Sequence, residues 1–265
     1  MEEKRTALIG CCTTLEQLPR VFAAGYDFFV LAGNWLTSLS EEEFARVLEQ
    51  KEQWPIPCRG INSAIAASVK ICGPGFDPKQ AQKYASLLCR RAAAIGVELI
   101  GIGSPNARGV YGSGSFLREW EETRRFLRIF ASTAAGFGMT VDWEPLNIRE
   151  ASFGVDWTES WDQVRALREE GIENLGILLD LYHMALQPYP LEDVLPAAPW
   201  INHIHIACPD HQAGRRYPNE ADLASICGTL RQLAAAGWHS DLSTEVFSGD
   251  PYEAGRLLKQ GLRWK

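Results

Sequence analysis

Four polar residues, far apart in the chain, each stand at or near the end of a short segment with a β-strand pattern. They are two glutamates, an aspartate and a histidine: Glu144, Asp180, His205 and Glu245. Carboxylate oxygens combined with an imidazole nitrogen suit a divalent ion such as Mn²⁺, Mg²⁺ or Co²⁺ and leave coordination positions open for a substrate. No thiolate belongs to the set, which disfavours a structural zinc site. The residue types therefore predict a catalytic metal ion.

Each of the four residues lies at the C-terminal end of a predicted β-strand. Residues 139–144 alternate polar and apolar side chains, and Pro145 stops the strand. The other three strands are predicted at 175–180, 201–206 and 242–247. The four residues are spaced by 36, 25 and 40 positions, and one strand–helix–strand unit takes about 30 residues or more. Consecutive parallel strands would bring all four side chains to one mouth. An acid after a strand, taken alone, is more often a helix cap or a solvated loop residue.

Three further polar residues lie near these strand ends. Asp142 and His203 precede Glu144 and His205 by two positions, so each would lie one layer deeper in a barrel. They could orient the metal ligands, or form a buried pair that satisfies only itself. Cys208 follows His205 closely, which makes it a minor candidate for catalysis.

The length and the element pattern favour one fold. The chain has 265 residues, close to the ~250 of an eight-fold β/α barrel. The remaining strands are predicted at 6–11, 27–32, 58–62 and 97–102, and the main helices at 78–95, 116–137, 157–169, 222–236 and 251–260. We therefore predict an α/β protein with a single (β/α)8 TIM barrel domain over residues 1–265. An open doubly wound sheet is the alternative, but the first strand lacks a following GxGxxG motif.

Two segments are expected to be loops. Gly103–Gly114 is rich in glycine and could cradle a phosphate or the end of a sugar, or simply connect two elements. Residues 209–218 form a polar stretch.

Composition excludes several classes of protein. The net charge of −7 argues against a nucleic-acid groove, which needs a basic stripe. The seven cysteines include no CxxC pair, so we expect reduced and mostly buried thiols. No apolar targeting segment is recognisable, and no apolar run reaches the ~20 residues of a membrane helix. We therefore expect a soluble, cytoplasmic protein.

The motifs around these residues resemble those of a known family, the xylose-isomerase-like TIM-barrel sugar isomerases and epimerases. The similarity is greatest to the D-tagatose and D-psicose (allulose) 3-epimerase group. The shared motifs are Glu144-Pro-Leu-Asn147-x-x-Glu150, Asp180-x-Tyr-His183-Met, His203-x-His205, Arg215-Arg-Tyr-Pro218 and Thr244-Glu245. They occur in the family's order and span most of the C-terminal half, so the set is more specific than any one motif.

The resemblance implies one divalent ion, Mn²⁺ first, with Mg²⁺, Co²⁺ and Zn²⁺ as alternatives, bound by the four predicted ligands. The ion would make the C3 proton of a ketose or related keto-sugar removable and stabilise a cis-enediolate. Glu144 and Glu245 would exchange that proton from opposite faces of the sugar, inverting C3. Glu150, His183 and Arg215 would bind substrate hydroxyls. Family members often form homodimers or homotetramers.

Departures from the family pattern leave other functions open. Val30 and Cys208 stand where many relatives carry an acid, and residues 209–214 include a short insertion, so the substrate could differ. A dehydratase or lyase acting on a keto-inositol or keto-glycoside would use the same site. An apurinic endonuclease of this barrel type needs a site for three zinc ions. The five histidines and the predicted acidic ligands of this chain are too few for such a site. A non-catalytic sugar- or metal-binding barrel is the remaining alternative.

Overall fold

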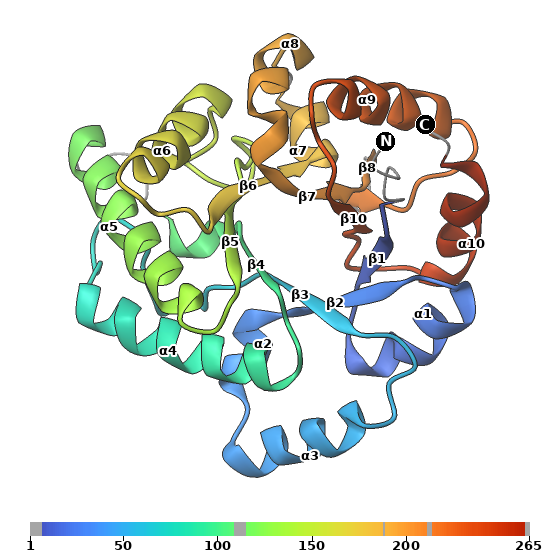
Figure 1. Cartoon of the computed structure of the whole chain (residues 1–265), viewed down its shortest axis with the longest axis horizontal. Coiled ribbons are helices and arrows are strands. Elements are labelled where there is room, and N and C mark those ends of the chain that lie inside the picture. Colours follow the sequence, from blue (N-terminus) through green and yellow to red (C-terminus); the bar gives the residue numbers. More distant parts are fainter. Residues whose placement is uncertain (1–6, 109–114, 188, 211–213, 263–265) are drawn as a thin grey trace. The chain divides into compact units, whose positions relative to one another are not determined.

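Eight parallel strands form a closed barrel in the order β1-β10-β7-β6-β5-β4-β3-β2 (Figure 1). This closed parallel sheet confirms the predicted (β/α)8 TIM barrel. The computed structural model describes residues 7–108, 115–187, 189–210 and 214–262. The chain divides into two compact units, a terminal unit of Met1–Val30 with Leu178–Lys265 and a central unit of Leu31–Ile177. The single domain expected over residues 1–265 stays a prediction.

All eight predicted barrel strands are present. They are β1 Ile9–Cys12, β2 Phe28–Ala32, β3 Cys58–Asn62, β4 Leu99–Ile102, β5 Thr140–Trp143, β6 Leu175–Asp180, β7 Ile201–Ile206 and β10 Asp241–Thr244. Glu144 and Glu245 were predicted inside strands, but each directly follows one. Their main-chain N–H groups still bond to the neighbouring strand, Glu144 to Ile102 at 3.2 Å and Glu245 to Ile206 at 3.1 Å. Both side chains therefore start from backbone that the barrel fixes.

The five main helices that the sequence predicted are all present, together with shorter ones. They are α1 Leu18–Ala24, α2 Gly33–Ser38, α3 Glu41–Lys51, α4 Pro78–Ala94, α5 Phe116–Ala135, α6 Trp157–Glu169, α7 Leu181–Leu186, α8 Leu191–Val194, α9 Leu223–Ala235 and α10 Pro251–Gly261. Short 3-10 turns occupy Leu15–Gln17, Pro105–Ala107 and Leu195–Trp200. Within the described residues, no helix combines the length and apolar character needed to cross a membrane.

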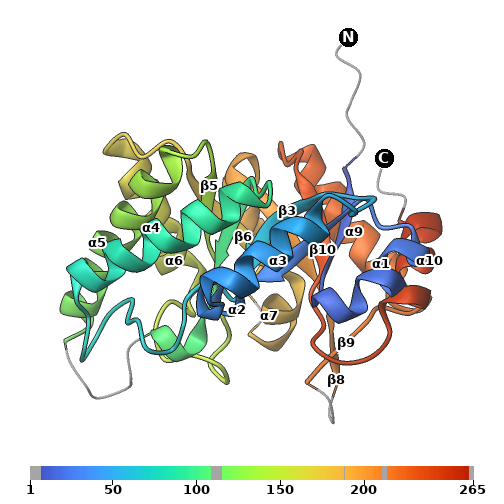
Figure 2. The ribbon, with the colours of Figure 1, turned by 90° about the horizontal axis from the view of Figure 1, so that it is seen from below.

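In the terminal unit, β1 pairs with β10 on one side and with β2 on the other, and β10 also pairs with β7. The segment 209–218 was expected to be a loop. Its residues 211–213 lie outside the described part, but the residues on either side of them form two paired strands. Strand β8 (Cys208–Asp210) pairs antiparallel with β9 (Gly214–Arg216), and Figure 2 shows this hairpin at the lower edge of the view. Gly214 has a φ of 75°, which a glycine adopts without strain. The hairpin gives Arg215 a fixed backbone.

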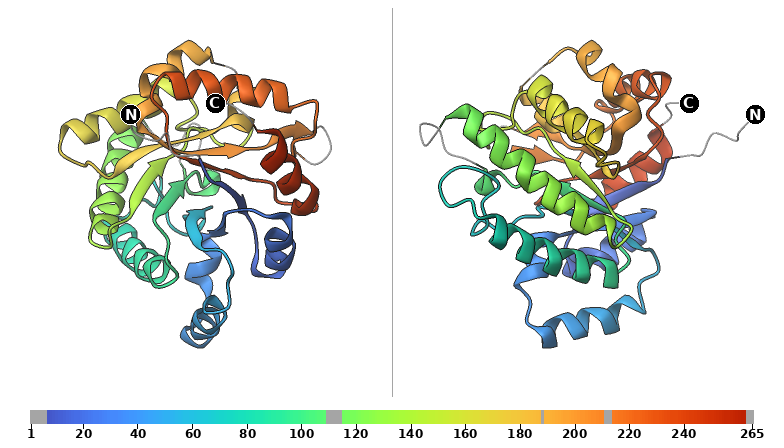
Figure 3. Two further views of the ribbon diagram at one scale, coloured as in Figure 1. Left: turned by 45° about the vertical axis from the view of Figure 1, so that its right-hand side comes forward. Right: turned by 60° about the vertical axis from the view of Figure 1, so that its left-hand side comes forward.

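In the central unit, β3, β4 and β5 pair in parallel, and β5 pairs with the start of β6. The long helices α4 and α5 lie side by side against these strands (Figure 3). Phe126 and Phe130 of α5 stack with ring centroids 4.9 Å apart and are fully buried. Helix α5 contacts β5, the strand that Glu144 directly follows.

The cysteines match the prediction. All seven are free thiols, and all seven are buried.

Candidate active site

Three of the four predicted metal ligands come together in the terminal unit. Asp180 ends β6, His205 lies near the end of β7, and Glu245 directly follows β10. All three are buried, and each offers one ligand atom within 4.8 Å of the others. Two carboxylates and one imidazole at this spacing can bind a divalent ion.

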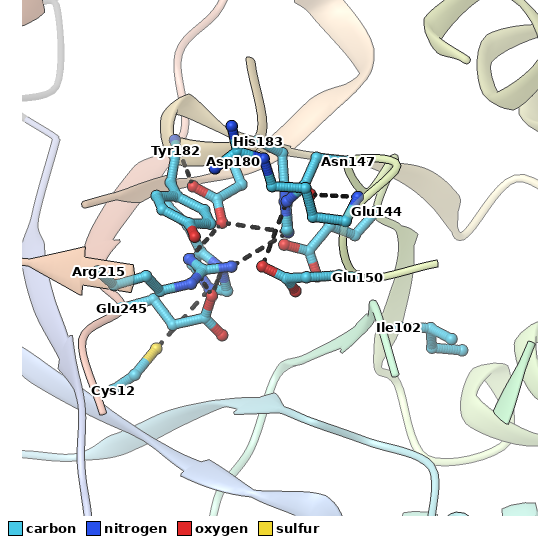
Figure 4. A network of polar contacts seen from close by, with 12 residues as sticks. Cys12, Ile102, Glu144, Asn147, Glu150, Asp180, Tyr182, His183, Arg215 and Glu245 are labelled. Carbon is cyan, nitrogen blue, oxygen red and sulfur yellow. Dashed lines mark hydrogen bonds and ion pairs between the residues drawn. The ribbon is translucent and has the colours of Figure 1, made fainter. Parts of the chain in front are cut away.

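A guanidinium group already lies between the two carboxylates (Figure 4). Arg215 Nη1 is 2.6 Å from Asp180 Oδ2 and 2.8 Å from Glu245 Oε2. The guanidinium also stacks over the Tyr182 ring, with its carbon 4.1 Å from the ring centroid. The position of the Arg215 guanidinium shows that the carboxylates of Asp180 and Glu245 can bind a cation between them. The donor set therefore fits the metal ion that the sequence predicted.

Asp180 is a helix cap, and its second carboxylate oxygen also faces the predicted metal site. Its Oδ1 accepts a hydrogen bond from the Tyr182 N–H at 2.8 Å and so caps α7. Its Oδ2 faces Arg215 Nη1 and lies 3.6 Å from His183 Nε2. Because α7 starts directly after Asp180, the short helix also fixes His183. His183 Nε2 is 3.1 Å from Arg215 Nη2, so the two predicted substrate-binding residues of this unit lie together beside the ligands.

A buried chain of polar side chains extends from His205 to His203. His203 Nε2 forms a 2.8 Å hydrogen bond with Ser243 Oγ, which lies 3.6 Å from Cys12 Sγ. Cys12 Sγ in turn lies 3.7 Å from His205 Nε2. His203 therefore reaches His205 through two intermediate side chains. Burial raises the pKa of the Cys12 thiol above its usual range, so Cys12 contributes a neutral S–H group.

Sequence reasoning missed Cys12 and Ser243, because neither belongs to a motif. The signal that could have found them is strand adjacency. Ser243 pairs with His205 across β10 and β7, and β1 lies on the other side of β10.

Cys208 does not fit the minor catalytic role considered for it. It lies in β8, and burial raises the pKa of its thiol to about 11. The thiolate needed for nucleophilic attack is therefore scarce at neutral pH.

In the central unit, the surroundings of Glu144 hold its position tightly. Glu144 is buried, and its main-chain carbonyl accepts a 2.5 Å hydrogen bond from Arg108 Nη2. Its carboxylate lies over Gly103, where an added Cβ would meet Glu144 Oε2 at 2.1 Å. Only glycine leaves room for the carboxylate in this position.

The buried side chain of Arg108 holds neighbouring loops together, a role that the sequence did not predict. Its five N–H groups donate to main-chain carbonyls, namely those of Ile102, Gly103, Glu144, Phe153 and Gly154. The guanidinium stacks on Trp143 at 3.8 Å from the ring centroid. Burial lowers the pKa of Arg108 to about 9, and the Glu144 charge opposes this effect. Arg108 thus stays protonated at neutral pH and ties together the segments that follow β4 and β5.

Two other predicted residues also lie in this unit. Glu150 is exposed, and its carboxylate accepts a 3.2 Å hydrogen bond from the Asn147 side chain. Asp142 is completely buried in β5. The substrate role of Glu150 and the orienting role of Asp142 stay predictions.

Comparison with known proteins decides the family. The sequence model of the xylose isomerase-like TIM barrel family matches residues 18–264. The chain belongs to this family. A search of curated proteins gives no significant match.

Several solved structures of this barrel type are similar to the chain. The 3-keto-D-glucoside 4-epimerase of E. coli is 19% identical, with a TM-score of 0.73 over 97% of this chain and 99% of that one. D-psicose 3-epimerase from Clostridium cellulolyticum H10, solved with D-tagatose, is 18% identical, with a TM-score of 0.71 over 97% and 90%. An IOLI protein with a bound zinc atom is 16% identical, with a TM-score of 0.69 over 96% and 95%. At these identities the likeness shows a shared fold.

Proposed function

We propose that the chain is an isomerase-class enzyme, a divalent-metal-dependent sugar isomerase or epimerase that inverts C3 of a ketose or related keto-sugar. The observation that carries the proposal is the convergence of Asp180, His205 and Glu245 on one buried place that attracts a cation. The family membership supports it, as do the sugar epimerases among the similar structures.

We assign four ligands to the metal ion, with Mn²⁺ as the proposed ion. Asp180, His205 and Glu245 are three, and Glu144 is the fourth, because it follows β5 as Glu245 follows β10. The zinc atom in the similar IOLI structure supports a metal at this type of barrel. A bound divalent ion would supply Lewis acidity, which makes a proton beside a substrate carbonyl more acidic.

Glu144 and Glu245 are the proposed acid–base pair. One carboxylate removes the C3 proton, and the other returns a proton to the opposite face, which inverts the carbon. Each starts from backbone bonded to a neighbouring strand, so each carboxylate can be held at a fixed distance from the substrate. Arg108 fixes the Glu144 main chain in addition.

Arg215 and His183 are the proposed substrate-binding groups of the terminal unit, and Glu150 is that of the central unit. Guanidinium and imidazole N–H groups can donate hydrogen bonds to sugar hydroxyls, and a carboxylate can accept them. Buried polar groups that bind hydroxyls reject substrates that lack them. These residues would therefore select the sugar.

Deuterium exchange tests the proposal. Mn²⁺-loaded protein is incubated in D₂O with a panel of ketoses, and deuterium at C3 is read by NMR. We expect exchange with at least one sugar, its loss in Glu245→Gln, and its retention in Glu253→Gln, which alters an exposed acid of α10. Exchange that survives Glu245→Gln, or no exchange at all, would refute the assignment. A dehydrated product would instead indicate the lyase alternative.

A further inference from the structure

The loops that follow β3, β4 and β5 line a cavity in the central unit. Its volume is about 410 Å³, and its polar lining comes from Lys70, Asn106, Arg108, Arg149, Glu150 and Ser152. Cavities of this size accommodate small-molecule ligands. Asn106 and Arg108 belong to the glycine-rich stretch for which the sequence left a phosphate or sugar cradle open.

The cavity is positively charged in an acidic protein. Among the described lining residues, three are cationic, Lys70, Arg108 and Arg149, and one, Glu150, is an acid. The whole chain carries a net charge of −7. A concave site lined by one sign of charge concentrates ligands of the opposite sign.

Two of these cations are available to a ligand. Among the described residues, neither Lys70 nor Arg149 forms an ion pair, and Lys70 Nζ donates only to the Asn106 carbonyl, at 2.8 Å. Arg108 has given all five N–H groups to main-chain carbonyls, so it contributes charge but no further hydrogen bond. The Asn106 amide and the Ser152 hydroxyl add neutral donors.

The cavity adjoins the proposed reaction centre of the same unit. Arg108 lines the cavity and also bonds to the carbonyl of Glu144. Glu150, the proposed partner of a sugar hydroxyl, lines the cavity as well. A sugar that presents its reacting carbon to Glu144 and a hydroxyl to Glu150 would extend its far end toward Lys70 and Arg149.

We propose that this cavity binds an oxyanion, a phosphate or a carboxylate, at the end of the substrate remote from the reacting carbon. The substrate would then be a ketose phosphate or a keto-sugar acid, bound by charge-assisted hydrogen bonds from Lys70 and Arg149. The proposal rests on the proposed function in one respect, since it takes the anion-bearing molecule to be the substrate.

The test compares D-fructose, D-fructose 6-phosphate and D-fructuronate on the Mn²⁺-loaded protein. Binding is measured by calorimetry and turnover by deuterium exchange. We expect at least one anion-bearing sugar to bind about tenfold more tightly than D-fructose, since a hydrogen bond to a charged group contributes that much or more. The sugar that binds more tightly, the phosphate or the carboxylate, shows which oxyanion the cavity binds.

The variants Lys70→Met and Arg149→Met should each lower the preference for the anion about tenfold. Lys79→Met, which removes one charge from the exposed start of α4 outside the cavity, should leave the preference as it is. Exchange on D-fructose without any preference for an anion would overturn this inference and keep the proposed function. Anion binding that depends on Lys70 and Arg149, without exchange on any sugar, would keep the anion site but refute both the function and the assignment of the anion to its substrate. Neither binding nor exchange would overturn both.

Discussion

Replacing Arg215 by methionine should destabilise the metal-free protein and make a divalent ion more strongly stabilising. Arg215 Nη1 contacts the carboxylates of Asp180 and Glu245 at 2.6 and 2.8 Å, and all three side chains are buried. The substitution would remove the cation that contacts both acids. Methionine keeps a side chain of similar length, so the change tests charge more than packing.

The expected magnitude follows from the burial of the group. Removing one partner of a buried ion pair costs about 3–5 kcal/mol of unfolding free energy. An unfolding entropy of about 2.1 cal/mol/K per residue converts this to a Tm lowered by roughly 5–9 °C. A metal ion at a hundred times its Kd adds about 2.7 kcal/mol. The gain should be larger in the variant, because no guanidinium competes for the same carboxylates.

Thermal unfolding with EDTA and with Mn²⁺ measures both effects. Arg216→Met is the matched control, because Arg216 lies next to Arg215 in β9 and also forms a 2.6 Å ion pair, with Asp222. That pair is partly exposed, at 35% and 21% for the two side chains, so its loss should cost about 1 kcal/mol or less. Equal losses in the two variants, or an equal gain from Mn²⁺, would refute the reasoning.

Three other substitutions test separate parts of the structure. Gly103→Ala should lower the exchange rate at least about tenfold, because the new Cβ would lie 2.1 Å from Glu144 Oε2 and displace the proposed base. Asp222→Asn should cost about 1 kcal/mol at pH 7, measured by urea unfolding. The Asp222 pKa is lowered to about 2 by its ion pair, so this stability is fully present above the unfolded pKa of about 3.9 and is lost as the pH falls toward 2. Cys12→Ala should weaken Mn²⁺ binding about tenfold, measured by calorimetry, because the contact behind His205 is lost, whereas Cys12→Ser should retain most of the affinity.

Each of these predictions has a control or a contradicting result. Gly228→Ala should leave exchange as it is, since an added Cβ there meets nothing within 4 Å. A stability deficit in Asp222→Asn that stays constant from pH 7 to pH 3 would contradict the ion-pair account. Equal Mn²⁺ affinities for the alanine and wild-type proteins would show that Cys12 has no role in positioning His205.

The barrel and the existence of all eight of its strands were predictable from the sequence, although the ends of several strands were not. Strands β3, β6 and β7 have the bounds that their residue patterns predicted. In β6 the pattern is a nearly continuous apolar run, which is typical of a strand buried on both faces of a parallel sheet. The meeting of Asp180, His205 and Glu245 was also predictable, since consecutive parallel strands present their C-terminal ends on one side.

The surroundings of these residues could not be predicted from the sequence, because they depend on contacts between distant segments. Cys12 and Ser243 are 231 positions apart, and they meet because barrel closure pairs β1 with β10. Arg215 reaches the carboxylates from a hairpin where the sequence predicted a loop. The charge of the central cavity combines residues from three loops. Local periodicity determines which side chains leave a strand on the same face, but contacts between distant segments depend on how the strands pair and how the loops fold.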